Sequence, residues 1–207
     1  EGPIAMADGS VIITEIKAQR LSRITPDGRR ETLVETGGGP NGAAIGPDGA
    51  IYITNNGGSF TWPEQNGLTI PGPTPASHTG GRIQRYDLKT GALTTLYEAC
   101  DGKRFVGPND LVFDRQGGFW FSDHGCSTPE GRKFGALYYA KPDGSHVERL
   151  RDHFVSPNGV GLSPDEDVVY MADTQLGRLW AFDIAEPGKL KPQEGFGPGR
   201  VVANLQG

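Results

Sequence analysis

The sequence predicts an all-β fold, and three observations support this prediction. A two-part unit of short strands and tight turns repeats four times along the 207 residues. Gly (32 residues) and Pro (16 residues) stand singly between hydrophobic runs, where they end strands and do not form a linker. Alternation with a period of two, as in I-Y-I-T and F-W-F-S, suits half-buried strands, and helical periodicity is nowhere sustained.

The repeated unit has the form expected of a propeller blade. Its first part, a turn followed by two strands, reads EGPIAMADGSVIITE, NGAAIGPDGAIYITN, NDLVFDRQGGFWFSD and NGVGLSPDEDVVYMAD. Its second part, another strand pair, reads QRLSRITPDGRRETLVE, GRIQRYDLKTGALTTLYE, GALYYAKPDGSHVERLR and GRLWAFDIAEPGKLKPQ. Four-stranded units of about 40 to 50 residues are typical of β-propellers. A β-sandwich with accidental similarity explains neither the fourfold register nor the matching turns.

We therefore expect a single domain, residues 1–207, containing about four blades. The blades cover about residues 1–38, 39–106, 107–155 and 156–207. The second blade carries an insertion rich in Gly, Pro and Thr at about residues 57–80. Because strand direction alternates within a blade, this insertion lies on the same face as the blade openings, as a surface loop or as a wall of a substrate pocket.

Two columns of polar residues follow from the register of the four units. The opening residues begin the blades, and they are Glu1, Asn41, Asn109 and Asn158. The strand-end residues close the second strands on the same face, and they are Glu15, Asn55, Asp123 and Asp173. A strand-end carboxylate or amide either bonds loop backbone amides or serves chemistry. Asp123 and the neighbouring His124 are catalytic candidates on the second reading, although a lone histidine is more often structural.

Three opening residues suggest a metal site. Glu1, Asn109 and Asn158 would present one carboxylate and two amide oxygens around a common axis. Such oxygen donors, without imidazole or thiolate, favour Ca²⁺ or Mg²⁺. An ion held there would polarise a carbonyl or phosphoryl oxygen. The alternative is that each asparagine only supplies a turn conformation.

Composition excludes several other classes of function. The formal net charge is -5 with both signs interleaved, so there is no basic stripe for nucleic acid. No apolar run approaches membrane-spanning length, and the first residues lack the features of a signal peptide, so we expect a cytoplasmic protein. Cys100 and Cys126 have no metal-binding spacing, and two unpaired thiols are favoured over a disulfide.

The motifs EGP, PND and SPNG in successive blades, with SPDEDVVYMADT and GRLWAFDI, resemble the SMP-30/gluconolactonase/LRE-like (regucalcin-like) family over essentially the whole chain. The resemblance implies a six-bladed propeller with one divalent cation, usually Ca²⁺, with Mg²⁺, Mn²⁺ or Zn²⁺ as alternatives. Glu1 matches the family's metal-binding glutamate, and Asn109 and Asn158 match its asparagines. Asn109 also faces the substrate in this scheme and is therefore a catalytic candidate. We expect Asn41, and Trp62 of the insertion, to line the substrate pocket.

The reaction implied by the resemblance is hydrolysis of a small sugar lactone such as gluconolactone. The ion polarises the lactone carbonyl and a carboxylate activates water. One alternative is a non-enzymatic propeller that binds a small molecule or a protein. Others are an organophosphate or other ester hydrolase of the same fold, and a strictosidine-synthase-like propeller, against which the combination of Glu1, Asn109 and Asn158 argues.

The sequence departs from the family pattern in two respects. The family has a further aspartate, a metal ligand and general base, in a PDG-type opening of the next blade, and it has two more blades. Neither has a counterpart here, so we expect the chain to be a piece of a longer protein and poorly active alone. Asp110 and Asp123 are the nearest substitutes for that aspartate, and neither fits its role in the family.

Overall fold

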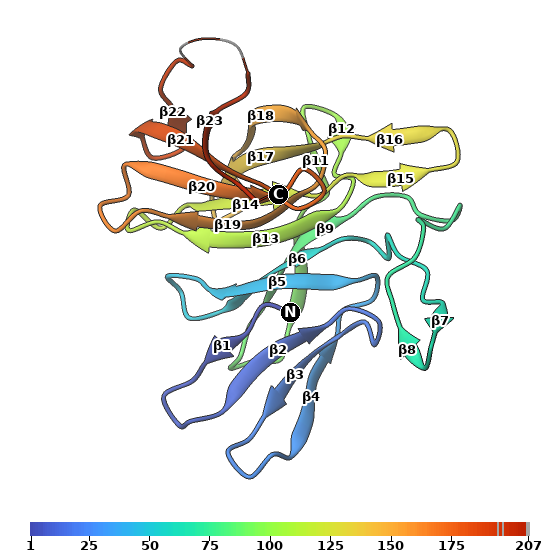
Figure 1. Ribbon diagram of the computed structural model, residues 1–207. Coiled ribbons are helices and arrows are strands. Elements are labelled where there is room, and N and C mark those ends of the chain that lie inside the picture. Colours follow the sequence, from blue (N-terminus) through green and yellow to red (C-terminus); the bar gives the residue numbers. More distant parts are fainter. Residues whose placement is uncertain (194, 196, 206–207) are drawn as a thin grey trace.

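Four antiparallel sheets, arranged in sequence order, make up most of the molecule (Figure 1). The computed structural model describes residues 1–193, 195 and 197–205, and these residues form strands and connecting turns without a helix. In this described part, therefore, no helix is long and apolar enough to cross a membrane. The all-β class predicted from the repeats is confirmed.

Each sheet corresponds to one copy of the repeated unit. The first contains β1 (Ile4–Ala5), β2 (Val11–Glu15), β3 (Arg20–Ile24) and β4 (Arg30–Glu35). The second contains β5 (Pro40–Ile45), β6 (Ile51–Asn55), β9 (Arg82–Tyr86) and β10 (Leu93–Tyr97). The third contains β13 (Pro108–Phe113), β14 (Phe119–Asp123), β17 (Gly135–Ala140) and β18 (Val147–Phe154). The fourth contains β19 (Pro157–Leu162), β20 (Val168–Asp173), β21 (Arg178–Glu186), β22 (Lys189–Leu190) and β23 (Arg200–Asn204).

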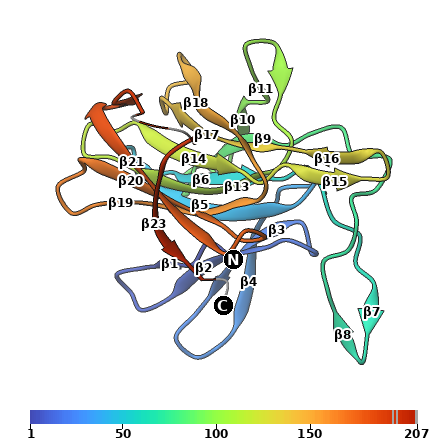
Figure 2. The same cartoon turned by 45° about the horizontal axis from the view of Figure 1, so that its top comes forward.

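Three small hairpins extend from the second and third sheets. They are β7 (Glu64–Gln65) with β8 (Leu68–Thr69), β11 (Ala99–Cys100) with β12 (Lys103–Arg104), and β15 (Cys126–Thr128) with β16 (Gly131–Lys133). The hairpin β7–β8 belongs to the insertion, and in two views it projects from the same side of the molecule as β15–β16 (Figures 1 and 2).

The first strands of the sheets lie next to one another, as the inner strands of propeller blades do. Strand β5 contacts β2 on one side and β13 on the other, and β13 in turn contacts β19. Among the described strands, none pairs the fourth sheet with the first. The four sheets therefore form a row of blades that does not close, and the six blades implied by the resemblance remain a prediction.

The core consists of three clusters, one between each pair of neighbouring sheets. In β6, Ile51 and Ile53 pack toward the first sheet, whereas Tyr52 packs toward the third. In β14, Phe121 and Trp120 point in opposite directions in the same way. The expectation that these strands are half-buried is wrong, because a sheet between two others buries both of its faces. Strand β2 of the first sheet does alternate between buried and half-buried residues.

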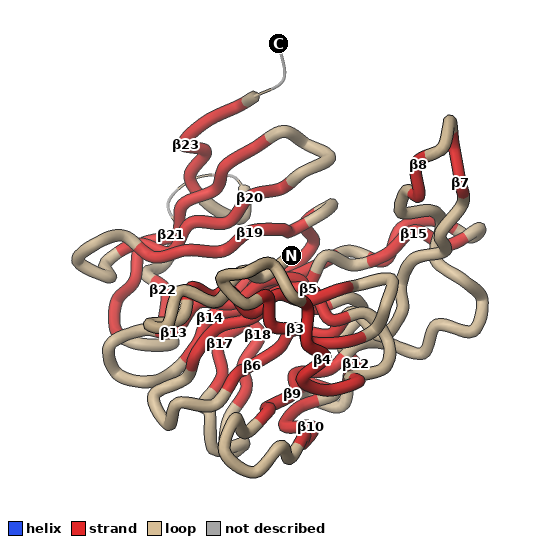
Figure 3. Tube along the Cα trace, turned by 90° about the horizontal axis from the view of Figure 1, so that it is seen from below, coloured by secondary structure: helices blue, strands red, loops and turns tan. Residues whose placement is uncertain are grey.

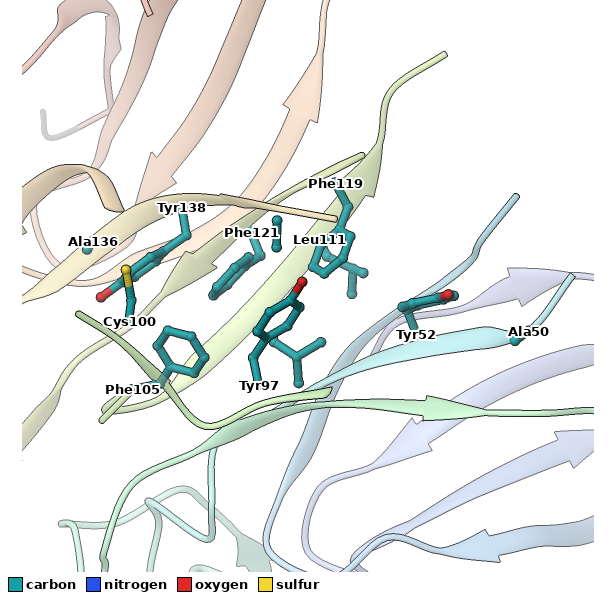
Figure 4. Close-up of a cluster of buried hydrophobic side chains, with 12 residues drawn as sticks. Ala50, Tyr52, Tyr97, Cys100, Phe105, Leu111, Phe119, Phe121, Ala136 and Tyr138 are labelled. Atoms are coloured by element: carbon teal, nitrogen blue, oxygen red, sulfur yellow. The ribbon is translucent and has the colours of Figure 1, made fainter. Parts of the chain in front are cut away.

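The middle cluster, between the second and third sheets, is rich in aromatic rings (Figure 4). Phe121 and Tyr138 stack with ring centroids 4.9 Å apart, and Phe105 meets Phe121 edge-on. Cys100 belongs to this cluster, and both it and Cys126 are free and buried. Burial accordingly raises the pKa of the Cys100 thiol. The preference for unpaired cysteines is confirmed.

Candidate functional site

A small pocket opens where the first strands of the four blades approach one another. Its volume is about 190 Å³, and all four opening residues line it. The full lining consists of Glu1, Gly2, Pro3, Asn41, Gly42, Asn109, Asp110, Asn158 and Gly159. Seen from below, the N-terminus lies near the middle of the arrangement of sheets (Figure 3). We call this the axial pocket.

Each opening asparagine sits in a β-bulge. The pairing of β5 with β6 shifts between Pro40 and Ala43, and β13 and β19 show the same irregularity after Pro108 and Pro157. A bulge leaves a residue without a ladder partner and re-aims its side chain, which is why bulges are frequent beside functional sites. The proline before each asparagine has no N–H group to lose from the ladder. The repeated Pro-Asn thus brings three amides to one place.

The amide groups of the opening asparagines are largely free of internal partners. Asn41 and Asn109 are only 5% and 7% exposed, yet their side chains make no hydrogen bond to any residue that the structure describes. Asn158 donates from Nδ2 to Thr174 Oγ1 at 2.9 Å, so its Oδ1 is the atom left for a ligand. Among the described residues, neither amide counts as a buried polar group without a partner, so both reach the pocket, where they are free to bind water or a ligand.

Asp110 supplies a second carboxyl group to the axial pocket. It is not among the site residues predicted from the sequence. Its Oδ2 accepts a hydrogen bond from the backbone N–H of Val160 at 2.9 Å, which satisfies the bulge of the neighbouring blade. Burial, with a smaller contribution from the charge of Glu1, raises the pKa of the Asp110 carboxyl. The sequence held a signal for it: glycine follows the opening residue in the other three blades (Gly2, Gly42, Gly159), and only the third blade has aspartate there.

The strand-end residues of blades two to four hold loop backbone. Asp123, 2% exposed, accepts three backbone N–H groups, those of Val106 and Gly107 at 2.7 Å and that of Gly125 at 2.9 Å. Asp173 likewise accepts from the backbone of Val155 and Ser156. Asp123 is not among the residues that line the axial pocket. Its geometry therefore supports the structural reading over the catalytic one.

Asn55 and Glu15 complete this column in different ways. Asn55 Oδ1 accepts from the backbone N–H groups of Gly39 and Gly57, both at 2.9 Å. Glu15 instead forms an ion pair with Arg20, with Nε and Oε1 2.8 Å apart. In the first blade, therefore, side chains of the neighbouring strand β3, Arg20 and Ser22, take the place of the loop backbone amides.

His124 lies beside the axial pocket and not in it. Its Nδ1 is 2.9 Å from the carbonyl oxygen of Pro157, the residue before Asn158, and burial lowers the pKa of its imidazole. It lines a second pocket of about 270 Å³ between the insertion and the hairpin β15–β16. We call this the insertion pocket.

The insertion pocket is lined by Phe60 and not by Trp62, the tryptophan proposed to contact substrate. Trp62 meets Phe60 edge-on, with ring centroids 6.1 Å apart, and so supports the wall from outside. Arg132 contributes a guanidinium group, which donates to the carbonyl oxygens of Val155 and His124 and to Ser127 Oγ. The insertion therefore lies at the same end of the blades as the opening residues. Its pocket presents the ring of Phe60 and the polar side chains of His124 and Arg132.

The side chains of the axial pocket suit a hard divalent cation. They offer two carboxylates and three amides, and none of the lining residues is Lys or Arg. Among the described residues, no group of three or more His, Cys, Asp or Glu side chains could hold a metal ion, so the amide oxygens would have to supply part of the ligand set. The donors are therefore the oxygen ligands that Ca²⁺ and Mg²⁺ prefer, and the softer donors that favour zinc are missing from this set.

Antiparallel sheets of four or five strands, placed side by side next to an oxygen-lined pocket, define a propeller-type fold with a candidate cation site. Residues 1–200 match the family model described as the SMP-30/Gluconolactonase/LRE-like region, and the chain belongs to this family. The resemblance stated from the EGP, PND and SPNG motifs is confirmed.

Similar proteins include enzymes with named hydrolytic activities. A gluconolactonase of Zymomonas mobilis is 24% identical over 211 residues, which cover 91% of this chain and 53% of that protein. A diisopropyl-fluorophosphatase of Loligo vulgaris is 26% identical over 158 residues, 65% of this chain and 49% of that protein. The chain thus spans about half the length of these relatives.

Solved structures agree on the fold. A gluconolactonase of Xanthomonas campestris has a TM-score of 0.70 at 26% identity, covering 95% of this chain and 61% of that one. A calcium-binding regucalcin of Agrobacterium tumefaciens has a TM-score of 0.64 at 20% identity, covering 93% of this chain and 57% of that one, and shows the fold alone.

Proposed function

We propose that the chain forms part of a divalent-cation-dependent hydrolase that opens a small sugar lactone. The observation that carries this proposal is the axial pocket, in which carboxylate and unpartnered amide groups converge from four blades with no cationic side chain. Family membership and the gluconolactonase relatives support the hydrolytic reaction.

In this proposal Glu1, Asn109 and Asn158 hold the cation, with Ca²⁺ first and Mg²⁺, Mn²⁺ or Zn²⁺ as alternatives. A bound cation would polarise the lactone carbonyl and stabilise the negative charge that develops on its oxygen. The Asn158 amide is oriented for this task, since Thr174 accepts from Nδ2 and leaves Oδ1 free. Asp110, anchored to Val160, adds a second carboxyl group to the lining of the site. Asn41 lines the wall of the same pocket, where it would contact the substrate.

The insertion pocket would receive the hydroxyl-bearing part of the substrate. It lies at the same end of the blades, and His124 links it to the backbone beside Asn158. Arg132 and His124 offer hydrogen bonds, and Phe60 offers an apolar ring face, a combination that suits a sugar.

The decisive experiment measures cation binding and lactone opening in one preparation. Ca²⁺, Mg²⁺, Mn²⁺ and Zn²⁺ are titrated by calorimetry into the whole hydrolase of which this chain is proposed to form part, and gluconolactone hydrolysis is followed by proton release. Asn158→Ala removes a proposed ligand, and we expect cation affinity to fall at least as much as the about 10- to 100-fold typical of lost outer-shell partners. Asn204→Ala, on the exposed strand β23, is the matched control and should bind as the wild type does.

Unchanged cation affinity in folded Asn158→Ala protein would contradict the assignment of this ligand. A wild type that binds cation and lactone without turnover would favour the non-enzymatic binding propeller. The Loligo vulgaris relative supports a second candidate, hydrolysis at phosphorus, so diisopropyl fluorophosphate is assayed in parallel. Faster hydrolysis of that substrate than of gluconolactone would favour the second candidate.

A further inference from the structure

One hydroxyl group reaches from each of the first three blades to the next blade. Thr54 Oγ1 donates to the backbone carbonyl oxygen of Asn109 at 2.6 Å, and Ser122 Oγ donates to that of Asn158 at 2.5 Å. Thr14 Oγ1 makes the same contact with the carbonyl oxygen of Asn41. Each of these hydroxyl residues directly precedes a strand-end residue, so the register of the repeat places them in one column.

The hydroxyl groups of Thr54 and Ser122 also accept a hydrogen bond from their own blade. The backbone N–H of Gly42 donates to Thr54 Oγ1 at 2.8 Å, and the backbone N–H of Asp110 donates to Ser122 Oγ at 3.2 Å. Thr54 thereby connects Gly42 of the second blade to Asn109 of the third. Ser122 connects Asp110 of the third blade to Asn158 of the fourth.

The β-bulges explain why hydroxyl groups are needed at these positions. The residues between Pro108 and Leu111, and those between Pro157 and Val160, have no partner in the strand ladder. Buried backbone groups without partners are costly, so they are nearly always satisfied in folded proteins. The hydroxyl groups of Thr54 and Ser122, both fully buried, supply the missing partners. Each accepts from one backbone N–H group and donates to one backbone carbonyl oxygen.

We propose that Thr54 and Ser122 are positioning residues for the cation site. They fix the main chain of Asn109 and Asn158, and hence the direction of the two amide groups, without touching the cation themselves. This inference rests on the proposed function, because it assumes that these two asparagines are ligands. Thr14 makes the same contact with Asn41, which we place in the pocket wall and not among the ligands. The equivalent residue of the fourth blade is Ala172, which has no hydroxyl group.

The test compares three variants that remove the same type of hydrogen bond. Thr54→Val and Ser122→Ala should each weaken Ca²⁺ binding about 10- to 100-fold, as is typical when an outer-shell partner of a ligand is lost. Thr36→Val is the matched control, because the buried Thr36 Oγ1 donates to the carbonyl oxygen of Gln19 at 2.9 Å and Thr36 does not line the axial pocket, so its Ca²⁺ affinity should stay close to that of the wild type. Thr14 is unsuitable as a control because its backbone N–H donates to the carbonyl oxygen of Glu1, a proposed ligand. Calorimetry measures affinity, and urea unfolding should show that all three variants lose stability to a similar extent. Thr54→Ser and Ser122→Thr keep the hydroxyl and should restore binding.

The outcomes separate this inference from the proposed function. If the wild type binds none of the four cations, the proposed function fails, and the positioning role fails with it. If the wild type binds Ca²⁺ and Thr54→Val and Ser122→Ala bind equally well, only the positioning role is overturned. Equal weakening in Thr36→Val would also overturn it, because a general loss of stability would then account for the weaker binding.

Discussion

The opening residues and the strand-end residues are two columns of similar side chains on the same face, and the structure uses them differently. The amides of Asn41 and Asn109 contact no hydrogen-bonding partner in the described part of the chain, and they line the axial pocket. The carboxylates of Asp123 and Asp173 are buried as deeply, but backbone N–H groups occupy them.

The difference shows that burial and residue type do not identify a functional side chain by themselves. A buried polar group is costly unless it has partners, so a group whose partners are all within the protein is accounted for by folding. A group that lines a pocket and has no partner within the protein remains free to bind water or a ligand there. Counting hydrogen bonds therefore separates two columns that look alike in the sequence.

The largest expected change in stability follows from replacing a strand-end residue, Asp123. Asp123→Ala removes the acceptor of three backbone N–H groups, two of them buried and that of Val106 partly buried. Each orphaned group costs about 1 to 3 kcal/mol, so we expect the free energy of unfolding to fall by at least about 3 kcal/mol. Urea unfolding of the two proteins measures this loss.

The matched variant is Asn109→Ala on the opening side. Its side chain is as buried but has no internal hydrogen bond to lose, and we expect a loss of less than about 1 kcal/mol. If Asn109→Ala were as destabilising as Asp123→Ala, the distinction between the two columns would be wrong.

A second prediction concerns the close approach of the inner strands that brings the opening residues together. A Cβ atom on Gly42 would lie 2.7 Å from both the carbonyl oxygen of Asn109 and the Cα of Asp110, so Gly42→Ala must push β5 away from β13. Overpacking of this kind costs about 1 to 3 kcal/mol. Gly161→Ala on β19 is the control, since its Cβ would meet nothing within 4 Å. Unfolding measurements should show a loss for the first variant and none for the second.

The repeat predicted the architecture that positions the site. Self-similarity in the chain set the register, and the register by itself assigned Glu1, Asn41, Asn109 and Asn158 to one face. The fold brings all four to one pocket. Periodicity serves well here because each blade is a local unit whose strands are close in the sequence.

The roles within each column could not be predicted, because they depend on contacts between blades. The acceptor of the Thr54 hydroxyl, Asn109, lies 55 residues further along the chain, and Val160, which Asp110 binds, lies 50 residues further. Trp62 and Phe60 are both aromatic residues of the insertion, and only the packed loop shows which of them lines the insertion pocket. Burial on both faces of β6 and β14 likewise arises from neighbouring blades, which a single strand pattern cannot reveal.

The smallest expected effect concerns Glu15, the strand-end residue that bonds side chains in place of loop backbone. Hydrogen bonding to Arg20, followed by that to Ser22, lowers the pKa of the Glu15 carboxyl from 4.5 to about 2. Because the folded pKa lies below the unfolded value, the ionised group stabilises the fold above about pH 4.5, and this stabilisation is lost as the pH falls toward 2. The side chain is partly exposed, so we expect a contribution of about 1 kcal/mol at pH 7.

Glu15→Gln should therefore lower the free energy of unfolding by about 1 kcal/mol at pH 7, and the difference from the wild type should shrink as the pH approaches 2. Glu31→Gln is the control, because Glu31 pairs with Arg29 at an exposed position and should matter little at either pH. Urea unfolding at pH 7 and at successively lower pH values measures both. A difference for Glu15→Gln that grows on acidification would show that the ion pair with Arg20 does not stabilise the first blade, and that blade would then lack the strand-end anchor that Asn55, Asp123 and Asp173 provide in the others.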